Sequence, residues 1–271
     1  MISFAVAINH IMNLLFKPLN AIPEDWGLML VSALVGIIML VIFKFTSNQQ
    51  KIKTAKDRIK AHILEIRLYN ESPRVIMRAL KRILQYNATY LRHAVVPIAF
   101  VIIPVVLILI NLNFRYGYQA FKPGDAFVVK AVLQKDADLE QVKLIVPPGV
   151  RVDTPALHIP ALSQVNWRLR IEKEGIYDLV FSYGATRVEK KLVAAQRAGM
   201  ISPQKPPASF FSVLANPAEN PLPASPFTTI EVLYSKRQNE FFGLHIHWLV
   251  TFFILSLIFA FALKKPLGVE I

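Results

Sequence analysis

Cysteine is absent from all 271 residues of the sequence. A disulfide framework and a thiolate metal site are therefore excluded, and the redox state of the compartment leaves no mark on the chain. The HExxH metalloprotease motif, the Walker-type phosphate loop and the nucleophile elbow are missing as well. We therefore expect a protein that is not an enzyme and that uses no cofactor and no metal.

Two pairs of polar residues carry a weak signal for chemistry. His245 and His247 are two positions apart, so on a helix they would point in different directions, and interfacial histidines are a better interpretation than a metal pair. Asp153 and His158 lie in a predicted proline-rich loop, where surface residues are a better interpretation than a catalytic pair.

Charged residues are also scarce. They make up 18% of the chain, against about 25% in a typical globular domain, while hydrophobic residues reach 54%. This imbalance indicates that part of the chain lies in a solvent other than water. The formal net charge of +13 favours anionic partners such as lipid head groups or nucleic acid, although the placement of the charges matters more than their sum.

Three windows of the sequence are almost free of charge. Residues 27–43 and 94–110 contain no ionised side chain, and between Glu240 and Lys264 only the two histidines could carry charge at neutral pH. A bilayer core of about 30 Å needs roughly 20 apolar residues of helix. We predict transmembrane helices over residues 26–45, 93–112 and 243–263. The alternative, that the two shorter windows are core helices of a soluble protein, is weakened because three such windows occur in one chain.

The N-terminal segment, residues 1–25, differs from a cleaved signal peptide. It has no basic region before its apolar residues, and no small-x-small cleavage site follows. The stretch "INHIMNLLFKPL" instead predicts a short amphipathic helix in the membrane interface, with Trp26 at the head-group boundary.

The distribution of basic residues predicts the orientation. Twelve Lys/Arg and three Asp/Glu lie between Lys44 and Arg92, whereas the segment before residue 27 has one lysine and two acidic residues. By the positive-inside rule this basic loop is cytoplasmic and the N-terminus is outside. Lys264 and Lys265 follow the last predicted span, which agrees with a cytoplasmic tail at 264–271. We expect a multi-pass protein of the bacterial inner membrane.

The loop at 46–92 has the pattern of a helical hairpin. Ile52, Ala55, Ile59, Ile63 and Ile66 recur at spacings of three and four and predict one apolar helix face. "NESP" breaks this helix, and Ser72 and Pro73 suit the start of a second one, with Ile76, Ala79, Leu80 and Ile83 on its apolar side. The remaining faces are basic, with Lys51, Lys53, Lys56, Arg58, Lys60, Arg67, Arg74, Arg78, Lys81 and Arg82.

Two interpretations of this basic surface stay open. In the first it is a solvated face and a topology signal alone, because any inward loop needs such residues. A topology signal needs only a few of them, however, and ten form a surface that attracts anionic lipid or ribosomal RNA phosphates. Aromatic interleaving and base-reading motifs are missing, so sequence-specific binding of nucleic acid is not expected.

After residue 113 the pattern changes to a period of two. "DAFVVKAVL", "QVKLIVP", "VNWRLRIEK", "YDLVFSYG" and "TRVEKKLVA" alternate apolar and polar residues between turn residues, as half-buried antiparallel strands do. We predict an extracytoplasmic all-β sandwich over 113–198. "EGIYDLVF" resembles the corner of an immunoglobulin-like domain, where a tyrosine anchors the strand. Residues 199–226 hold seven prolines, so 199–242 is predicted to be a proline-rich linker.

The order of these segments resembles a known family. "NLLFKPLNAIPEDWGLMLVSALVG" leads into the first span and "FKFTSNQQKIKTAKDRIK" leaves it. Both are similar to the corresponding parts of the YidC/Oxa/Alb superfamily of membrane-protein insertases, and above all to its minimal three-span branch, which includes the archaeal homologues and the insertase subunit of the endoplasmic-reticulum membrane complex. The chain differs in having no basic residue inside the first span and in carrying its β-domain between the second and third spans.

The resemblance implies roles for several residues. The basic hairpin would meet the ribosome, a nascent client or anionic lipid, and the three spans would form a groove open to the cytoplasm, in which polar groups ease the passage of hydrophilic segments. Groups that could line this groove, or pack the helices, are Ser32, Gly36, Pro97, Pro104, His247 and Thr251.

Two functions from different classes follow. The first is an insertase or chaperone that assists the insertion or assembly of membrane proteins without ATP. The second is a non-enzymatic scaffold or sensor, whose extracytoplasmic β-domain binds a protein partner and whose hairpin binds anionic lipid.

Overall fold

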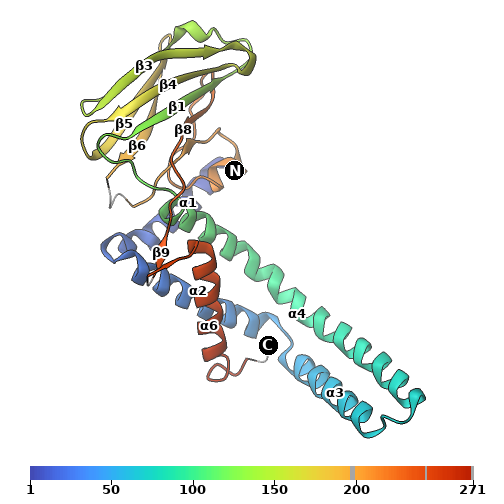
Figure 1. Cartoon of the computed structure of the whole chain (residues 1–271). Coiled ribbons are helices and arrows are strands. Elements are labelled where there is room, and N and C mark those ends of the chain that lie inside the picture. The colour runs from blue at the N-terminus through green and yellow to red at the C-terminus, as the bar shows by residue number, and fades with distance from the viewer. Residues whose placement is uncertain (196–198, 242, 270–271) are drawn as a thin grey trace. The chain divides into compact units, whose positions relative to one another are not determined.

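The computed structural model describes residues 1–195, 199–241 and 243–269, and these separate into two units (Figure 1). The helical unit comprises Asp25–Val106 and Leu249–Ile271, and the β unit comprises Met1–Glu24 and Leu107–Trp248. A helical membrane part and a two-sheet β part are therefore both present, as the sequence predicts.

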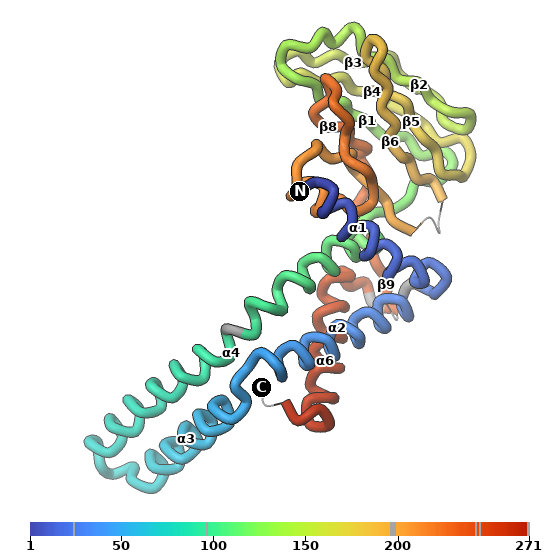
Figure 2. Tube along the Cα trace, turned by 180° about the vertical axis from the view of Figure 1, so that it is seen from behind, coloured from blue at the N-terminus to red at the C-terminus, as the bar shows by residue number. Residues whose placement is uncertain are grey.

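The helical unit is built from α2 (Glu24–Thr46), α3 (Gln49–Leu68), the first three quarters of α4 (Pro73–Tyr116) and nearly all of α6 (Trp248–Leu263). The side chain of Asn48 caps α3 by accepting a hydrogen bond from the Lys51 amide at 3.0 Å. Pro73 opens α4 at the position where its missing amide proton costs nothing. In both views of the chain, α3 and α4 run side by side as an antiparallel hairpin (Figure 2).

Helix α4 is a single helix of 44 residues, about 66 Å long at 1.5 Å per residue. The sequence predicts a hairpin helix that ends at residue 92 and a separate span from residue 93, but one continuous helix covers both. Pro97 and Pro104 both lie inside it. A proline in an apolar helix of this kind is tolerated when neighbouring groups or local adjustment satisfy the freed carbonyls.

Within the described residues, three helical segments are long and apolar enough to cross a membrane: Ile2–Ala21, Asp25–Thr46 and Pro73–Tyr116. The sequence also predicts three spans, but only two of the three segments are the same. The first of these is the segment predicted to lie in the interface, where α1 (Ile2–Phe16) is followed by the 3-10 helix η1 (Lys17–Ala21). The third predicted span, 243–263, contains only the 16 residues of α6, because β10 (Leu244–His245) pairs with β9 (Glu240–Phe241) just before it.

The β unit contains two packed sheets in its described part. One has the strand order β3-β4-β1-β8-β7 and the other the order β2-β5-β6, and the paired strands are antiparallel. The first sheet comprises β1 (Ala126–Leu133), β3 (Val150–Ile159), β4 (Gln164–Ile171), β7 (Gln204–Lys205) and β8 (Phe227–Val232). The second comprises β2 (Val142–Ile145), β5 (Gly175–Tyr183) and β6 (Thr186–Ala194). Short helices η2 (Leu139–Gln141), η3 (Pro160–Leu162) and α5 (Phe210–Leu214) lie in the connections.

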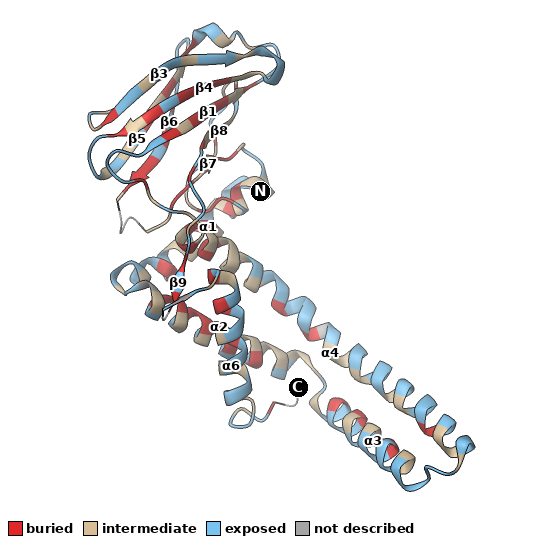
Figure 3. Ribbon diagram, viewed as in Figure 1, coloured by how far each residue is buried: buried red, intermediate tan, exposed pale blue. Residues whose placement is uncertain are grey.

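The core of the β unit lies between the sheets and is apolar and aromatic. Alternate residues of β1 and β4 point into it, as the period of two predicts (Figure 3). The ring of Phe181 on β5 contacts Trp167 on β4 and Phe227 on β8 edge to face, with centroids 5.7 and 6.3 Å apart. These aromatic contacts join one sheet to the other.

The predicted linker at 199–242 is instead part of the β unit. It contains β7, α5 and β8, and β8 pairs with β1 in the interior of its sheet, where Ile230 is fully buried. The prolines of this segment lie outside β8, which reads "FTTIEV" and alternates in burial over its last four residues. The β sandwich therefore extends well past residue 198.

The predicted loop around Asp153 and His158 is the edge strand β3. It contains Pro155 and two register irregularities, features that edge strands tolerate. Asp153 forms a salt bridge with Arg170 at 2.8 Å, and the hydrogen bond from Arg170 holds the pKa of this carboxyl below its ordinary value. Asp153 is thus a structural ion-pair residue of the sheet.

Candidate functional site

The basic surface predicted on the hairpin is present on α3 and the first turns of α4. Nine of its ten Lys/Arg side chains are exposed and Lys56 is half-buried. Large apolar side chains are exposed on the same hairpin, among them Leu68, Met77 and Leu84, with exposed fractions of 74%, 67% and 70%. Much of this hairpin is exposed (Figure 3), and its exposed residues include both basic and large apolar side chains.

The seam between α3 and α4 differs from the predicted stripes in one residue of each helix. Ile52, Ala55 and His62 are buried on α3, whereas Ile63, predicted on this face, is 54% exposed. The ring of His62 stacks on Tyr86 of α4 at 5.8 Å, and its Nδ1 lies 2.7 Å from Glu65 Oε2. Residues 52, 55, 59, 62 and 66 keep the helical spacing, so a polar ring with two partners replaces an isoleucine in the stripe. Leu80 of α4 is also more exposed than predicted, at 43%.

Gly36 of α2 lies against the backbone of α6. A Cβ atom added to Gly36 would stand 2.7 Å from the carbonyl oxygen of Ser256, closer than such atoms approach. The absence of a side chain lets the two helices touch, as small residues do in membrane helix pairs.

Of the two hydroxyl groups predicted to line a groove, that of Ser32 is engaged within its own helix and that of Thr251 is not. Ser32 donates to the Leu28 carbonyl at 2.7 Å, and Ser256, which the sequence analysis does not select, donates to the Phe253 carbonyl at 3.0 Å. The Oγ1 atom of Thr251 is buried, and no partner for it occurs among the described residues. Thr251 is therefore the predicted groove residue whose buried hydroxyl keeps its hydrogen-bonding capacity.

The remaining predicted groove residues do not gather at one place. Pro97 is buried and Pro104 half-buried, seven residues apart on α4. His247 is exposed ahead of α6, with its ring 5.7 Å from that of Trp248. His247 belongs to the β unit and Thr251 to the helical unit.

The β unit also contains a buried ionic cluster that was not predicted from the sequence. Lys190 shares a face of β6 with Val188 and Leu192, and its side chain is fully buried. Its Nζ atom donates to the carboxylate of Glu219 at 2.7 Å, to the Ser202 carbonyl at 2.9 Å and to the Lys191 carbonyl at 3.0 Å. A lysine at a core position of an edge strand thus holds the segment after residue 199 against the sandwich.

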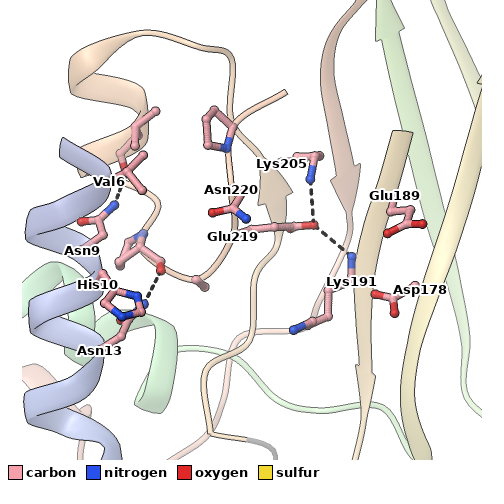
Figure 4. A pocket seen from close by; sticks show the side chains of 14 residues that line it. Val6, Asn9, His10, Asn13, Asp178, Glu189, Lys191, Lys205, Glu219 and Asn220 are labelled. Carbon is pink, nitrogen blue, oxygen red and sulfur yellow. Dashed lines mark hydrogen bonds and ion pairs between the residues drawn. The ribbon is translucent and has the colours of Figure 1, made fainter. Parts of the chain in front are cut away.

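Glu219 is the centre of this cluster. Besides Lys190 it accepts from the Lys191 amide at 3.0 Å and the Ser202 hydroxyl at 2.9 Å, and it lies 3.7 Å from the Lys205 amine (Figure 4). Burial lowers the pKa of Lys190, and the adjacent carboxylate opposes that change. The pattern "VEKKLV", with a lysine between two inward apolar residues, is the signal that could have revealed Lys190.

A pocket of about 380 Å³ lies beside this cluster (Figure 4). The strands β5 and β6 contribute Asp178, Glu189 and Lys191, and the segment after β6 contributes Lys205, Glu219 and Asn220. Its other wall is helix α1, with Asn9, His10 and Asn13. Charged side chains of both signs therefore face one hollow.

Helix α1 is held against the rest of the β unit by its amide side chains. Asn9 donates to the Val213 carbonyl at 2.6 Å, and Asn13 donates to the Pro217 carbonyl at 2.9 Å. Asn13 also accepts a hydrogen bond from Asn111 at 3.2 Å, which connects it to the end of α4. The polar side of α1 is thus directed at protein.

Among the described residues, no group of three or more His, Asp or Glu side chains could hold a metal ion. A comparison with known proteins finds no matching family model, no matching curated protein and no matching solved structure.

Proposed function

We propose that this protein assists the insertion or assembly of other membrane proteins, without ATP and without a cofactor. The observation that carries the proposal is the hairpin of α3 and α4, where exposed basic side chains and exposed apolar side chains occur together on one projection. A nascent membrane protein presents apolar helices with charged flanks, and the ribosome presents RNA phosphates, so such a surface suits both.

We propose the orientation given by the positive-inside rule, with the hairpin in the cytoplasm and the β unit outside the bacterial inner membrane. In this arrangement α1 lies in the interface, because its Asn9 and Asn13 side chains bond to the β unit. Helix α6 crosses with its 16 mostly apolar residues, about 24 Å, which local thinning of the bilayer accommodates.

The resemblance to the YidC/Oxa/Alb superfamily supports the proposal through the order of segments: an interfacial helix, a first span, a basic hairpin and a second span. The buried hydroxyl of Thr251 is the group in the helical unit best suited to offer a hydrogen bond to a polar client segment. An unpaired polar group in lipid costs several kcal/mol, so even one such site lowers the barrier for a hydrophilic flank.

We further propose that the β unit is immunoglobulin-like. Its sheets β3-β4-β1 and β2-β5-β6 match the order of strands D-E-B and C-F-G, with β8 in the place beside β1 that the first strand usually occupies. The hydroxyl of Tyr177 donates to the Lys173 carbonyl at 2.7 Å, which supports a tyrosine corner between β4 and β5.

The test of insertion is site-specific photocrosslinking in cells. A probe at Arg58 on the hairpin should give adducts with ribosomal or nascent-chain components, whereas a probe at Asp136, exposed in the β unit, serves as the matched control and should not. Depletion should leave small membrane proteins uninserted. Normal insertion of the whole membrane proteome after depletion would exclude the proposal.

The second candidate is a scaffold or sensor, and the pocket of the β unit is the observation that favours it. In that case replacing residues 118–239 by a short linker abolishes function, and neutralising the hairpin only weakens it by reducing binding to anionic lipid. If the protein is an insertase, neutralising the hairpin should instead abolish function, and replacing residues 118–239 should only weaken it.

A further inference from the structure

The pocket between α1 and the sandwich contains charged side chains with unused hydrogen-bonding capacity. Asp178, Glu189 and Lys191 lie exposed on β5 and β6, and within the described chain their side chains form no ion pair or hydrogen bond. Asp178 and Lys191 are directly opposite each other in the strand pair. Glu219 differs, because its carboxylate already receives three hydrogen bonds.

The charges of this pocket fit a ligand that carries both signs. The two free carboxylates can hold an ammonium group, and the amines of Lys191 and Lys205 can hold an anion such as a phosphate. A ligand that carries both signs can pair with the carboxylates and the amines at once, whereas a ligand of one sign can pair with only one of the two sets. The arrangement therefore selects for a zwitterion.

Helix α1, which forms one wall of the pocket, indicates that such a zwitterion is part of a lipid. Helix α1 directs Asn9, His10 and Asn13 at the pocket, and its other face exposes Phe4, Ile11, Leu14 and Leu15 to between 59% and 68%. His10 and Leu14 are one turn apart and therefore adjacent on the helix surface. Uncovered apolar area thus begins within one turn of the charged pocket, on a helix that is joined by few residues to the membrane helix α2.

We propose that this pocket binds the head group of a phospholipid with a primary ammonium, of the phosphoethanolamine type. Asp178 and Glu189 accept hydrogen bonds from the ammonium, Lys191 and Lys205 face the phosphate, and the acyl chains lie along the apolar face of α1. A quaternary ammonium has no proton to donate, so a phosphocholine lipid of the same charge fits less well. Head-group binding does not require the insertion activity proposed above.

Native mass spectrometry of the full chain in detergent tests this assignment. The protein is titrated with phosphatidylethanolamine and, separately, with phosphatidylcholine of the same acyl chains. We expect one phosphatidylethanolamine to be retained with an affinity at least about tenfold higher, because each lost charge-assisted hydrogen bond is worth a factor of this order. Equal retention of the two lipids would overturn the proposal.

Two variants of equal charge change provide the control. Asp178→Asn with Glu189→Gln should bring the affinity for phosphatidylethanolamine down to that for phosphatidylcholine. Asp136→Asn with Glu140→Gln, at exposed positions away from the pocket, should leave the preference unchanged. If the variant with Asp178→Asn and Glu189→Gln still prefers phosphatidylethanolamine, the proposal is wrong.

Soluble glycerophosphoethanolamine distinguishes the lipid from a free head group. If the acyl chains contribute along α1, the soluble compound should fail to displace the lipid at concentrations about a hundredfold above it, because apolar burial then supplies much of the affinity. Displacement at comparable concentration would show a soluble ligand and overturn the assignment to a membrane lipid.

Discussion

At the scale of single residues, Lys190 and Glu219 are an ion pair removed from water. A buried pair is costly to break, because removing one partner leaves the other charged and unpaired. Among the described residues, Glu219 is the only carboxylate that pairs with Lys190, whereas Glu219 also has Lys205 and two other donors beside it. Loss of Glu219 should therefore harm the fold more than loss of Lys190.

We predict that Glu219→Gln lowers the free energy of unfolding of the β unit by about 3 kcal/mol. The double change with Lys190→Met should recover most of this loss, because no buried charge is then left alone. The buried indole of Trp167 provides a fluorescence signal for denaturation of the full chain in detergent. Lys191→Met, at an exposed neighbour, should shift stability by less than about 0.5 kcal/mol.

At the scale of elements, the close approach of α2 and α6 depends on Gly36. We predict that Gly36→Ala destabilises the helical unit by about 1–3 kcal/mol, because the new methyl group would meet the Ser256 carbonyl. Thermal unfolding in detergent measures the change. Leu34→Phe adds volume at a position of α2 that is 51% exposed and should have little effect. Equal stability of the Gly36 variant and the native chain would contradict this contact.

A substitution in β8 tests whether this segment is a strand of the sheet or a linker. Ile230→Ala should cost about 2–5 kcal/mol, because Ile230 is fully buried beside β1. In a linker the same change would have almost no effect. Thr228→Ala, two positions away and exposed, is the control, and both are compared by chemical denaturation.

The sequence predicts the elements with a strong period and misses those with interrupted or short patterns. β1, β4, β5 and β6 alternate cleanly, and the sequence finds them. β3 is hidden by Pro155 and its bulges, and β8 by the seven prolines that precede it, although each strand is stabilised by pairing with a neighbour that local sequence does not reveal.

The candidate sites divide in the same way. The basic side chains of the hairpin depend only on helical spacing, so the sequence places them on the surface. The cluster of Lys190 and Glu219 joins residues 29 positions apart and depends on how the later segment closes the sandwich, which spacing alone does not give. The sequence also does not predict the intrahelical hydrogen bonds of Ser32 and Ser256.

At the scale of the whole molecule, the absence of native cysteine makes topology measurable, because any introduced thiol is unique. We predict that a membrane-impermeant maleimide labels Asp136→Cys in intact spheroplasts but labels Arg67→Cys only after permeabilisation. Both positions are exposed, so accessibility within the protein does not limit the reaction. Labelling of both cysteines from the same side would contradict the proposed orientation.

The position of β8 has a consequence for biosynthesis. Its partner β1 is complete at Leu133, yet β8 begins only at Phe227. A growing chain is synthesised at about 5–20 residues per second. The edge of β1 that pairs with β8 therefore remains unpaired for several seconds while the intervening residues are made. During that interval the nascent sheet is open to pairing with another copy or with a passing strand. The order of the strands thus leaves one edge of β1 unpaired until the last part of the β unit has been synthesised.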